Sequence, residues 1–225
     1  MKVVPKRKWR YPLALEREYS KYLVKYVEDN MAIVKQFIPQ MEELLLSYAL
    51  HVDADSAALT QLEILLDKLH AAMKDPEQMT NTIRAMSIRV DRYNQMEWDA
   101  ITKSVLGMPM SEIPFERLHH DAEADDSLRA LWVAENLDLI KSVDQQTMQR
   151  IKQVLQEKIV GNVNRRELAK DLAEEIEKIT GLEKNRAMLI ARDQIGKLNS
   201  RLTQYRQEHA GIEEYKWSTS HDRRV

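Results

Sequence analysis

The chain has 225 residues, a formal net charge of −2 and no cysteine, which excludes disulfide bonds, thiolate metal ligands and a cysteine nucleophile. The near-neutral charge argues against nucleic-acid binding by the molecule as a whole, and no apolar run approaches the ~20 residues of a membrane span, so we expect no membrane contact. Aromatic residues make up only 6% of a composition rich in helix formers. We expect a mainly α, elongated protein in two helical parts, with at most a small β element near the C-terminus.

Residues 1–11 form a basic N-terminal arm in which cations are interleaved with aromatic residues. Such a pattern can bind DNA by phosphate contact and base stacking, or dock on an acidic protein surface. It is also typical of a solvated chain terminus, and all three interpretations stay open. The residues available for a portal or DNA contact are Lys6, Arg7, Lys8, Trp9 and Arg10.

Residues 12–106 are predicted to form an N-terminal helical domain. Apolar residues recur at helical spacing over 13–50, and a break is expected at Pro39 because proline lacks an amide donor and clashes with the preceding turn. Aspartate followed by proline at 75–76 has the chemistry of a helix start. The helix that begins there is predicted to run to about Leu106.

The stretch 107–126 contains a glycine, two prolines and an acidic run, so it is predicted to be a linker and a domain boundary. Gly107 is expected to end the preceding helix. The sequence His119-His120-Asp121 resembles metal ligands, but adjacent side chains diverge and a site needs three or four that converge. We therefore expect no metal and no cofactor.

A long amphipathic helix is expected over 127–160, because its apolar residues recur at three- and four-residue steps. Asn164 and Glu167 have the spacing of a capping box. This spacing predicts a shorter helix over 165–179, closed by Gly181 and followed at once by another helix, as in an αα-hairpin.

The last forty residues, 186–225, are the most informative part of the chain. They begin as a helix for which Gly211 is the natural residue after the C-cap. A short extended piece is expected at 212–217, and a polar turn at 218–224. The apolar stripe of the helix is predicted to contain Leu189, Ile190, Ile195, Leu198 and Leu202. The residues expected on the other faces are Arg192, Lys197, Arg201 and Arg206.

These segments resemble the phage head morphogenesis family, the Mu F-like minor head proteins. The strings that carry the resemblance are LIARDQ (189–194), KLN (197–199), GIEEY (211–215), WST (217–219) and DRRV (222–225), with WVAEN (132–136), LIKS (139–142) and RELA (166–169) upstream. The resemblance implies that 127–225 is a helical Mu F-like domain and that the family motif continues beyond Val225.

By resemblance, the protein is a minor head component of a bacteriophage, associated with the portal and other head proteins, with several copies per virion. It would lie in the phage head near the portal vertex, and in the host cytoplasm during assembly. Some family members are linked to DNA packaging or delivery, which implies a contact with phage DNA. The matching positions, either partner-binding or structural, are Arg192, Asp193, Asn199, Trp217, Thr219, Asp222 and Arg223. In the structural interpretation, Arg192 and Asp193 hold the helix against the terminal turn and Trp217 anchors that turn by burial.

Two other functions remain as alternatives. Mu F-like domains also occur fused to C-terminal toxin or transferase domains, so the chain could be a carrier module for an enzyme. It could also be a nucleic-acid-binding protein that acts through its basic arm. No Walker loop, dinucleotide glycine motif, nucleophile elbow or His-Glu-x-x-His pair is present, so we expect no enzymatic activity in this chain.

Overall fold

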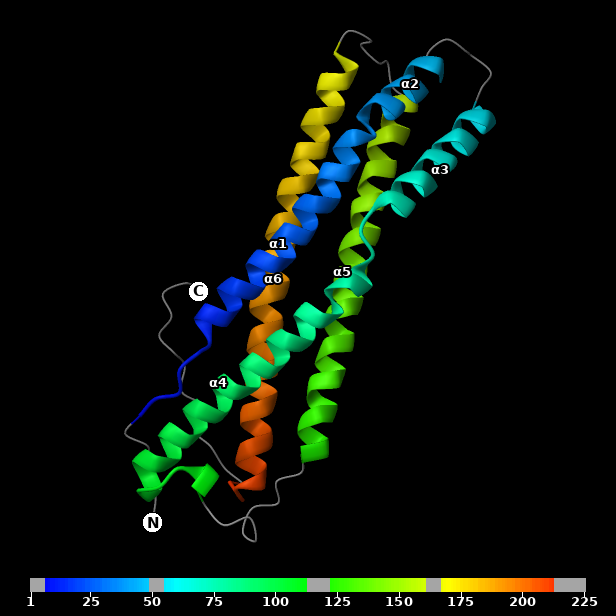
Figure 1. Cartoon of the computed structure of the whole chain (residues 1–225). Helices are drawn as coiled ribbons and strands as arrows, with labels where there is room; N and C mark the ends of the chain where they lie inside the picture. Colours follow the sequence, from blue (N-terminus) through cyan, green and yellow to red (C-terminus); the bar gives the residue numbers. More distant parts are fainter. Residues whose placement is uncertain (1–6, 49–54, 113–121, 161–166, 213–225) are drawn as a thin grey trace.

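The computed structural model describes residues 7–48, 55–112, 122–160 and 167–212, and it is an elongated bundle of long helices (Figure 1). These ranges contain six α-helices, two short 3-10 helices and no strand. The elements are α1 (Leu13–Gln36), α2 (Ile38–Tyr48), α3 (Asp55–Ala72), η1 (Pro76–Met79), α4 (Thr80–Leu106), η2 (Met110–Glu112), α5 (Ala122–Val160) and α6 (Leu168–His209). The prediction of a mainly α, elongated protein is confirmed. The β element expected near Tyr215–Trp217 lies outside the described residues.

Proline and glycine end the helices of the N-terminal half where the sequence predicts. α1 ends at Gln36 and α2 begins at Ile38, so Pro39 lies in the first turn of a new helix, where its missing amide is tolerated. Gly107 ends α4 in the left-handed conformation, with φ +81°, and its amide donates to the carbonyl of Lys103. Both predicted helix ends are therefore confirmed.

The C-terminal end of α6 is a Schellman motif built on Gly211. Gly211 has φ +69° and donates its amide to the carbonyl of Glu208, at 3.0 Å. The amide of Ile212 donates to the carbonyl of Gln207, also at 3.0 Å. These two bonds satisfy carbonyls that the end of a helix leaves without partners, and they confirm the role predicted for Gly211.

The prediction that Gly181 ends a helix is wrong. α6 runs without a break from Leu168 to His209, a length of about 63 Å at 1.5 Å per residue. Its buried face passes straight through this point, with Ile179 before the glycine and Glu183 after it. Glycine inside a helix costs only ~1 kcal/mol relative to alanine, less than the burial of one such turn contributes. The αα-hairpin is therefore one continuous helix.

The starts of α5 and α6 also differ from the prediction. α5 begins at Ala122, five residues before the expected start, and Asp126 pairs with Arg129 within its second turn. α6 begins at Leu168, so Glu167 is the N-cap residue and not the third residue of the helix. Its side chain makes no capping hydrogen bond, and Asn164 lies outside the described residues. The capping box, which requires Asn164, therefore stays a prediction.

α6 is the element on which the others assemble. Ion pairs between α1 and α6 join Lys35 to Glu177 and Glu28 to Lys184, so the two helices are antiparallel. α5 is likewise antiparallel to α6 and contacts it along much of its length. One hydrophobic core includes buried residues from all six α-helices, on both sides of the segment 107–126. The domain boundary placed there stays a prediction, but the helices before and after it share this core.

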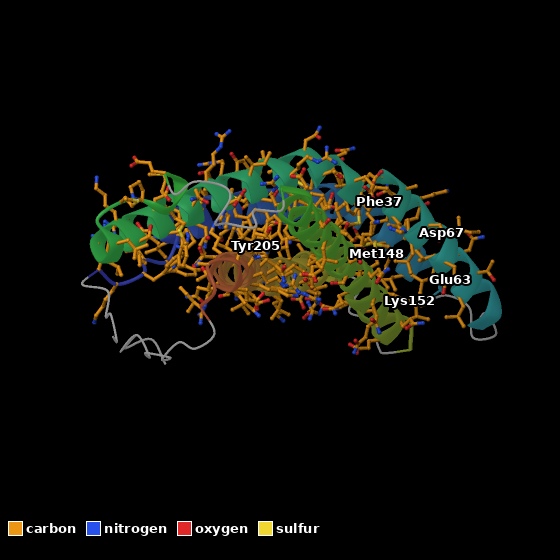
Figure 2. All side chains as sticks on the ribbon, turned by 90° about the horizontal axis from the view of Figure 1, so that it is seen from below. Phe37, Glu63, Asp67, Met148, Lys152 and Tyr205 are labelled. Atoms are coloured by element: carbon orange, nitrogen blue, oxygen red, sulfur yellow. The ribbon has the colours of Figure 1, made fainter. Side chains whose placement is uncertain are left out.

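Seen along the bundle, α5 and α6 lie beneath α3 and α4 (Figure 2). At one end Lys152 of α5 lies beside Glu63 of α3, and their side chains form an ion pair with an N–O distance of 2.5 Å. Such exposed pairs contribute little stability. The apolar core and the polar clusters within it therefore carry the fold.

Candidate functional site

The residues proposed from the sequence as one site do not share one environment. Arg192 and Asp193 are exposed on the outer face of α6, whereas Asn199 is buried against α4. The remaining candidates, Trp217, Thr219, Asp222 and Arg223, lie outside the described residues, as does the terminal turn that Arg192 and Asp193 were expected to hold. The His119-His120-Asp121 cluster lies outside them as well.

Two further predictions about α6 are wrong. Leu189, placed in its apolar stripe, is 63% exposed, because the stripe follows 187, 190, 191, 194 and 198 instead. Arg206, placed on a solvated face, is only 8% exposed. Ile190, Ile195, Leu198 and Leu202 are buried as predicted. The spacing of the apolar residues predicted the buried face of α6 to within about a third of a helical turn. It could not predict that this face contains the charged side chain of Arg206.

The described part of the basic arm is packed against α4 and α6. Arg7 forms an ion pair with Glu97, with an N–O distance of 2.7 Å, and the ring of Trp9 lies 6.3 Å from that of Trp98. Lys8 and Arg10 are exposed. Three buried polar atoms at this contact have no hydrogen-bond partner among the described residues: Nε of Arg7, Nε1 of Trp9 and Oε2 of Glu97. Since each unsatisfied group costs about 1–3 kcal/mol, the contact is weaker than its ion pair suggests.

Tyr11 continues this contact onto α6. Its hydroxyl donates to the carbonyl of Arg192, at 3.2 Å, and its ring lies 3.8 Å from where a side chain at Gly196 would begin. The hydroxyl of Tyr93 on α4 lies 3.3 Å from the carbonyls of both Arg10 and Tyr11. Residues 7–11 therefore bridge α4 and α6. Lys8 and Arg10 are the arm residues whose charges face solvent, and Lys6 lies outside the described residues.

A buried polar cluster, which we call the central cluster, joins the two segments that carry the family resemblance. It consists of Tyr19, Trp132, Asn136 and Gln194, all at most 3% exposed. The Tyr19 hydroxyl donates to Oδ1 of Asn136, at 2.8 Å, and the indole N–H of Trp132 donates to the carbonyl of Gln194, at 2.9 Å. The amide of Asn136 donates to the side-chain oxygen of Gln194, at 3.2 Å. The cluster locks α1, α5 and α6 in one register, as satisfied buried networks do.

Just outside the central cluster, Glu135 of α5 lies between two cations of α6. Lys197 is 2.9 Å from it, and Arg201 binds both of its oxygens. Burial acts to raise the pKa of Glu135, but the hydrogen bonds from Lys197 and Arg201 outweigh burial and the net shift lowers the pKa. This ion-pair cluster extends the α5–α6 contact towards solvent.

A second buried cluster, the α4–α6 cluster, surrounds Asn94 and Arg206. The side-chain amide of Asn94 donates to the carbonyl and the Oδ1 of Asn199, both at 3.0 Å. The guanidinium of Arg206 donates to Oδ1 of Asn94, to Oε1 of Gln95 and to the carboxylate of Asp91. Asn199, predicted as either partner-binding or structural, is therefore positioned for the structural role.

A third cluster contains two buried carboxyl groups that sequence reasoning missed. Asp144 of α5 is 6% exposed and accepts hydrogen bonds from Tyr26 and Asn30 of α1, at 2.5 and 3.3 Å. Burial raises its pKa to about 6. Glu183 of α6 is fully buried beside Arg150, and burial raises its pKa as well. The one feature of the sequence that indicated these two buried carboxyl groups was the position of each within the apolar stripe of its helix.

This arrangement is suited to specifying one packing of the helices. Its buried polar groups mostly bind one another across α1, α4, α5 and α6. Among the described residues, no group of three or more His, Asp or Glu side chains could hold a metal ion. In the same ranges, no helix is both long and apolar enough to cross a membrane.

Comparison with known proteins finds a relative of part of this chain. A protein of Haemophilus influenzae described as uncharacterized is 36% identical to the chain over 149 residues, which is 66% of this chain and 31% of that protein. The chain thus spans about a third of the length of the relative it matches. No protein-family model and no solved structure matches the chain.

Proposed function

We propose that this protein is a bacteriophage head morphogenesis protein, a minor head component that associates with the portal and acts through protein–protein contacts. The observation that carries the proposal is the central cluster. It joins Trp132 and Asn136 from one motif segment to Gln194 from the other, 58 residues further along the chain. The two segments that resemble the Mu F-like family are thus parts of one structural unit, as one inherited domain requires.

The surface of α6 favours a binding role over a catalytic one. Arg192 and Asp193 are exposed side by side, and Leu189 exposes 63% of its surface one turn before them. In the described residues the Arg192 side chain forms no ion pair, and Asp193 accepts only from the neighbouring Gln194 amide. These side chains are available to a partner, because no ion pair within the described residues engages them. We assign the portal contact to this face.

The test is co-sedimentation with the portal ring and with the empty capsid of the same phage, with free DNA as a parallel arm. The variant Arg192→Glu/Asp193→Lys reverses both charges on the outer face of α6. Its matched control, Lys178→Glu/Glu174→Lys, reverses two exposed charges further along the same helix. We expect wild type and control to co-sediment with the portal at moderate salt and the first variant to lose at least tenfold in affinity.

A separate variant examines the arm. Lys8→Glu/Arg10→Glu removes the exposed arm charges without touching Arg7 or Trp9, and Lys68→Glu/Lys103→Glu is its control at exposed positions elsewhere. If only DNA binds, with a steep dependence on salt that the arm variant abolishes, the protein is a nucleic-acid binder and the assembly proposal fails. Binding to neither portal, capsid nor DNA also refutes the proposal.

The second candidate is a carrier module for a further domain. It is favoured by the relative's length, because the matched 149 residues are only 31% of that protein. Reading the coding sequence beyond codon 225 tests it. A long continuation that contains a catalytic set supports the carrier function, and a stop codon at that position refutes it.

A further inference from the structure

The corner between α3 and η1 is held by the side chains of α1. At this corner the backbone amide of Lys74 donates to Oδ1 of Asn30, at 2.8 Å, and its carbonyl accepts from the hydroxyl of Tyr26, at 2.9 Å. The ammonium of Lys74 pairs with Asp29, at 2.7 Å. Three residues within five positions of α1 thus bind one residue of the corner.

The Tyr26 hydroxyl faces two acceptors and has one hydrogen to donate. Besides the Lys74 carbonyl, it lies 2.5 Å from Oδ2 of Asp144. A phenol can donate once and accept, whereas an ionised carboxylate can only accept. The three oxygens of Tyr26, Lys74 and Asp144 therefore cannot all be joined by hydrogen bonds while Asp144 is ionised.

The number of hydrogens available decides which protonation state of Asp144 satisfies the oxygens of Tyr26, Lys74 and Asp144 together. With Asp144 protonated, its O–H donates to the Tyr26 oxygen, and the Tyr26 hydroxyl is free to donate to the Lys74 carbonyl. With Asp144 ionised, the charged acceptor takes the Tyr26 hydrogen, because hydrogen bonds to a charged group are about twice as strong as neutral ones. The Lys74 carbonyl then loses the donor that the described residues offer it. One proton on Asp144 thus decides whether α1 holds this carbonyl.

The charges around Asp144 come from every side of the cluster. α1 contributes Tyr26 and the neutral Asn30, α3 contributes the exposed His70, and α6 contributes Glu183. Asp75 of the corner acts on Tyr26, Arg150 and Arg186 face Glu183, and Lys141 is engaged with Glu77 of η1. Burial is the largest influence and raises the pKa of Asp144 to about 6, with Glu183 acting in the same direction and Tyr26, Asn30 and His70 opposing.

We propose that Asp144 is a proton-operated latch, whose protonated carboxyl group lets Tyr26 hold the Lys74 carbonyl and whose ionised form releases the corner between α3 and η1. The latch connects α5 to the joint at which α3 meets α4. Releasing it frees this joint while the central cluster and the α4–α6 cluster, which share none of these residues, stay closed.

Amide hydrogen exchange of the full chain, followed residue by residue, tests the latch. The protection factor of the Lys74 amide, corrected for the intrinsic pH dependence of exchange, is compared at pH 5 and pH 8. The Lys74 amide donates to Asn30 and therefore reports opening of the corner as a whole. We expect its protection to fall about fivefold at pH 8, the equivalent of losing the one hydrogen bond of about 1 kcal/mol from Tyr26. The amides of α6 around Gln194 report global unfolding, so their pH dependence gives the part of the change that the fold as a whole undergoes.

Two variants open or close the latch independently of pH. Asp144→Asn carries a donor and an acceptor as the protonated acid does, so Lys74 should stay protected at both pH values. Tyr26→Phe removes the hydroxyl, so at both pH values the Lys74 amide should show the lower protection that wild type shows at pH 8, with its bond to Asn30 intact. Asp138→Asn, an exposed aspartate on the same helix, is the matched control and should behave like wild type. Protection of Lys74 that does not change with pH in wild type, or that changes equally in Asp144→Asn, overturns the proposal.

Discussion

Replacing Arg206 by leucine tests whether the buried charge of the α4–α6 cluster stabilises the fold. The guanidinium is 8% exposed and binds three side chains of α4: Asp91, Asn94 and Gln95. Leucine keeps the apolar packing of the arginine stem and removes all three hydrogen bonds. The change therefore isolates the polar contribution of one side chain.

The magnitude follows from what the substitution leaves behind. Removing one partner of a buried ion pair costs about 3–5 kcal/mol when the other charge is left alone. Asp91 is not left alone, because Arg129 of α5 still binds its second oxygen. We therefore expect the free energy of unfolding to fall by about 3 kcal/mol, the lower end of that range. For a chain of this size, that lowers the melting temperature by roughly 6–12 °C.

Urea unfolding followed by circular dichroism measures this difference, and Arg192→Leu is its matched control. Arg192 lies on the same helix and is exposed, so the identical substitution there should change stability by less than about 0.5 kcal/mol. Asp91→Asn in the Arg206→Leu background should cost less than Asp91→Asn in wild type. A loss below about 1 kcal/mol for Arg206→Leu, or an equal loss in the control, would refute the reasoning.

Three further predictions concern other parts of the bundle. Tyr19→Phe leaves Oδ1 of Asn136 buried without its donor, so the free energy of unfolding should fall by about 1–3 kcal/mol, whereas Tyr22→Phe at an exposed hydroxyl should have no measurable effect in the same urea titration. Gly181→Ala should raise the free energy of unfolding by about 0.5–1 kcal/mol, because an added Cβ meets nothing within 4 Å inside a regular helix. Gly107→Ala should lower it by about 1–2 kcal/mol, because φ is +81° there. Thermal melts in which the two variants shift in the same direction would contradict this. The pKa of Asp144 is raised from 3.8 to about 6, so the folded protein binds this proton more tightly than the unfolded chain does. The stability it contributes is complete below about pH 4 and is lost as pH rises to about 6, a decrease of about 3 kcal/mol that Asp144→Asn should abolish in denaturant titrations across pH.

The backbone chemistry of single residues predicted much of the fold. Pro39, Gly107 and Gly211 ended helices as expected, since each restricts or permits a conformation whatever surrounds it. Gly181 failed because its effect in a helix is small and the packing on either side decides the outcome. A strong backbone preference can therefore be predicted from the sequence alone. A weak one, such as that of a glycine inside a helix, is decided by the residues that pack around it in the fold.

The buried polar residues show where prediction from sequence stops. Arg206 looks like a member of a solvated face and Asp144 lies within the apolar stripe of its helix, and their partners lie 111 to 118 residues away in the sequence. No periodicity within one helix can reveal a partner on another. The motif match singled out Asn199 without indicating that Asn94 binds it. Of the candidate site, therefore, sequence identified part of the residues and none of the pairings.

The antiparallel contact of α1 with α6 has a consequence for synthesis of the protein. α1 is made long before α6, yet its buried face meets α6, and Tyr11 reaches a carbonyl 181 residues later. While the ribosome is still translating α5, the apolar side of α1 has no permanent partner, and chains in this state are prone to aggregate. A premature stop before Leu168 would yield helices without the surface that closes their core. We expect such fragments to be recovered with chaperones or in inclusion bodies, and a longer chain to fold only after α6 has emerged from the ribosome.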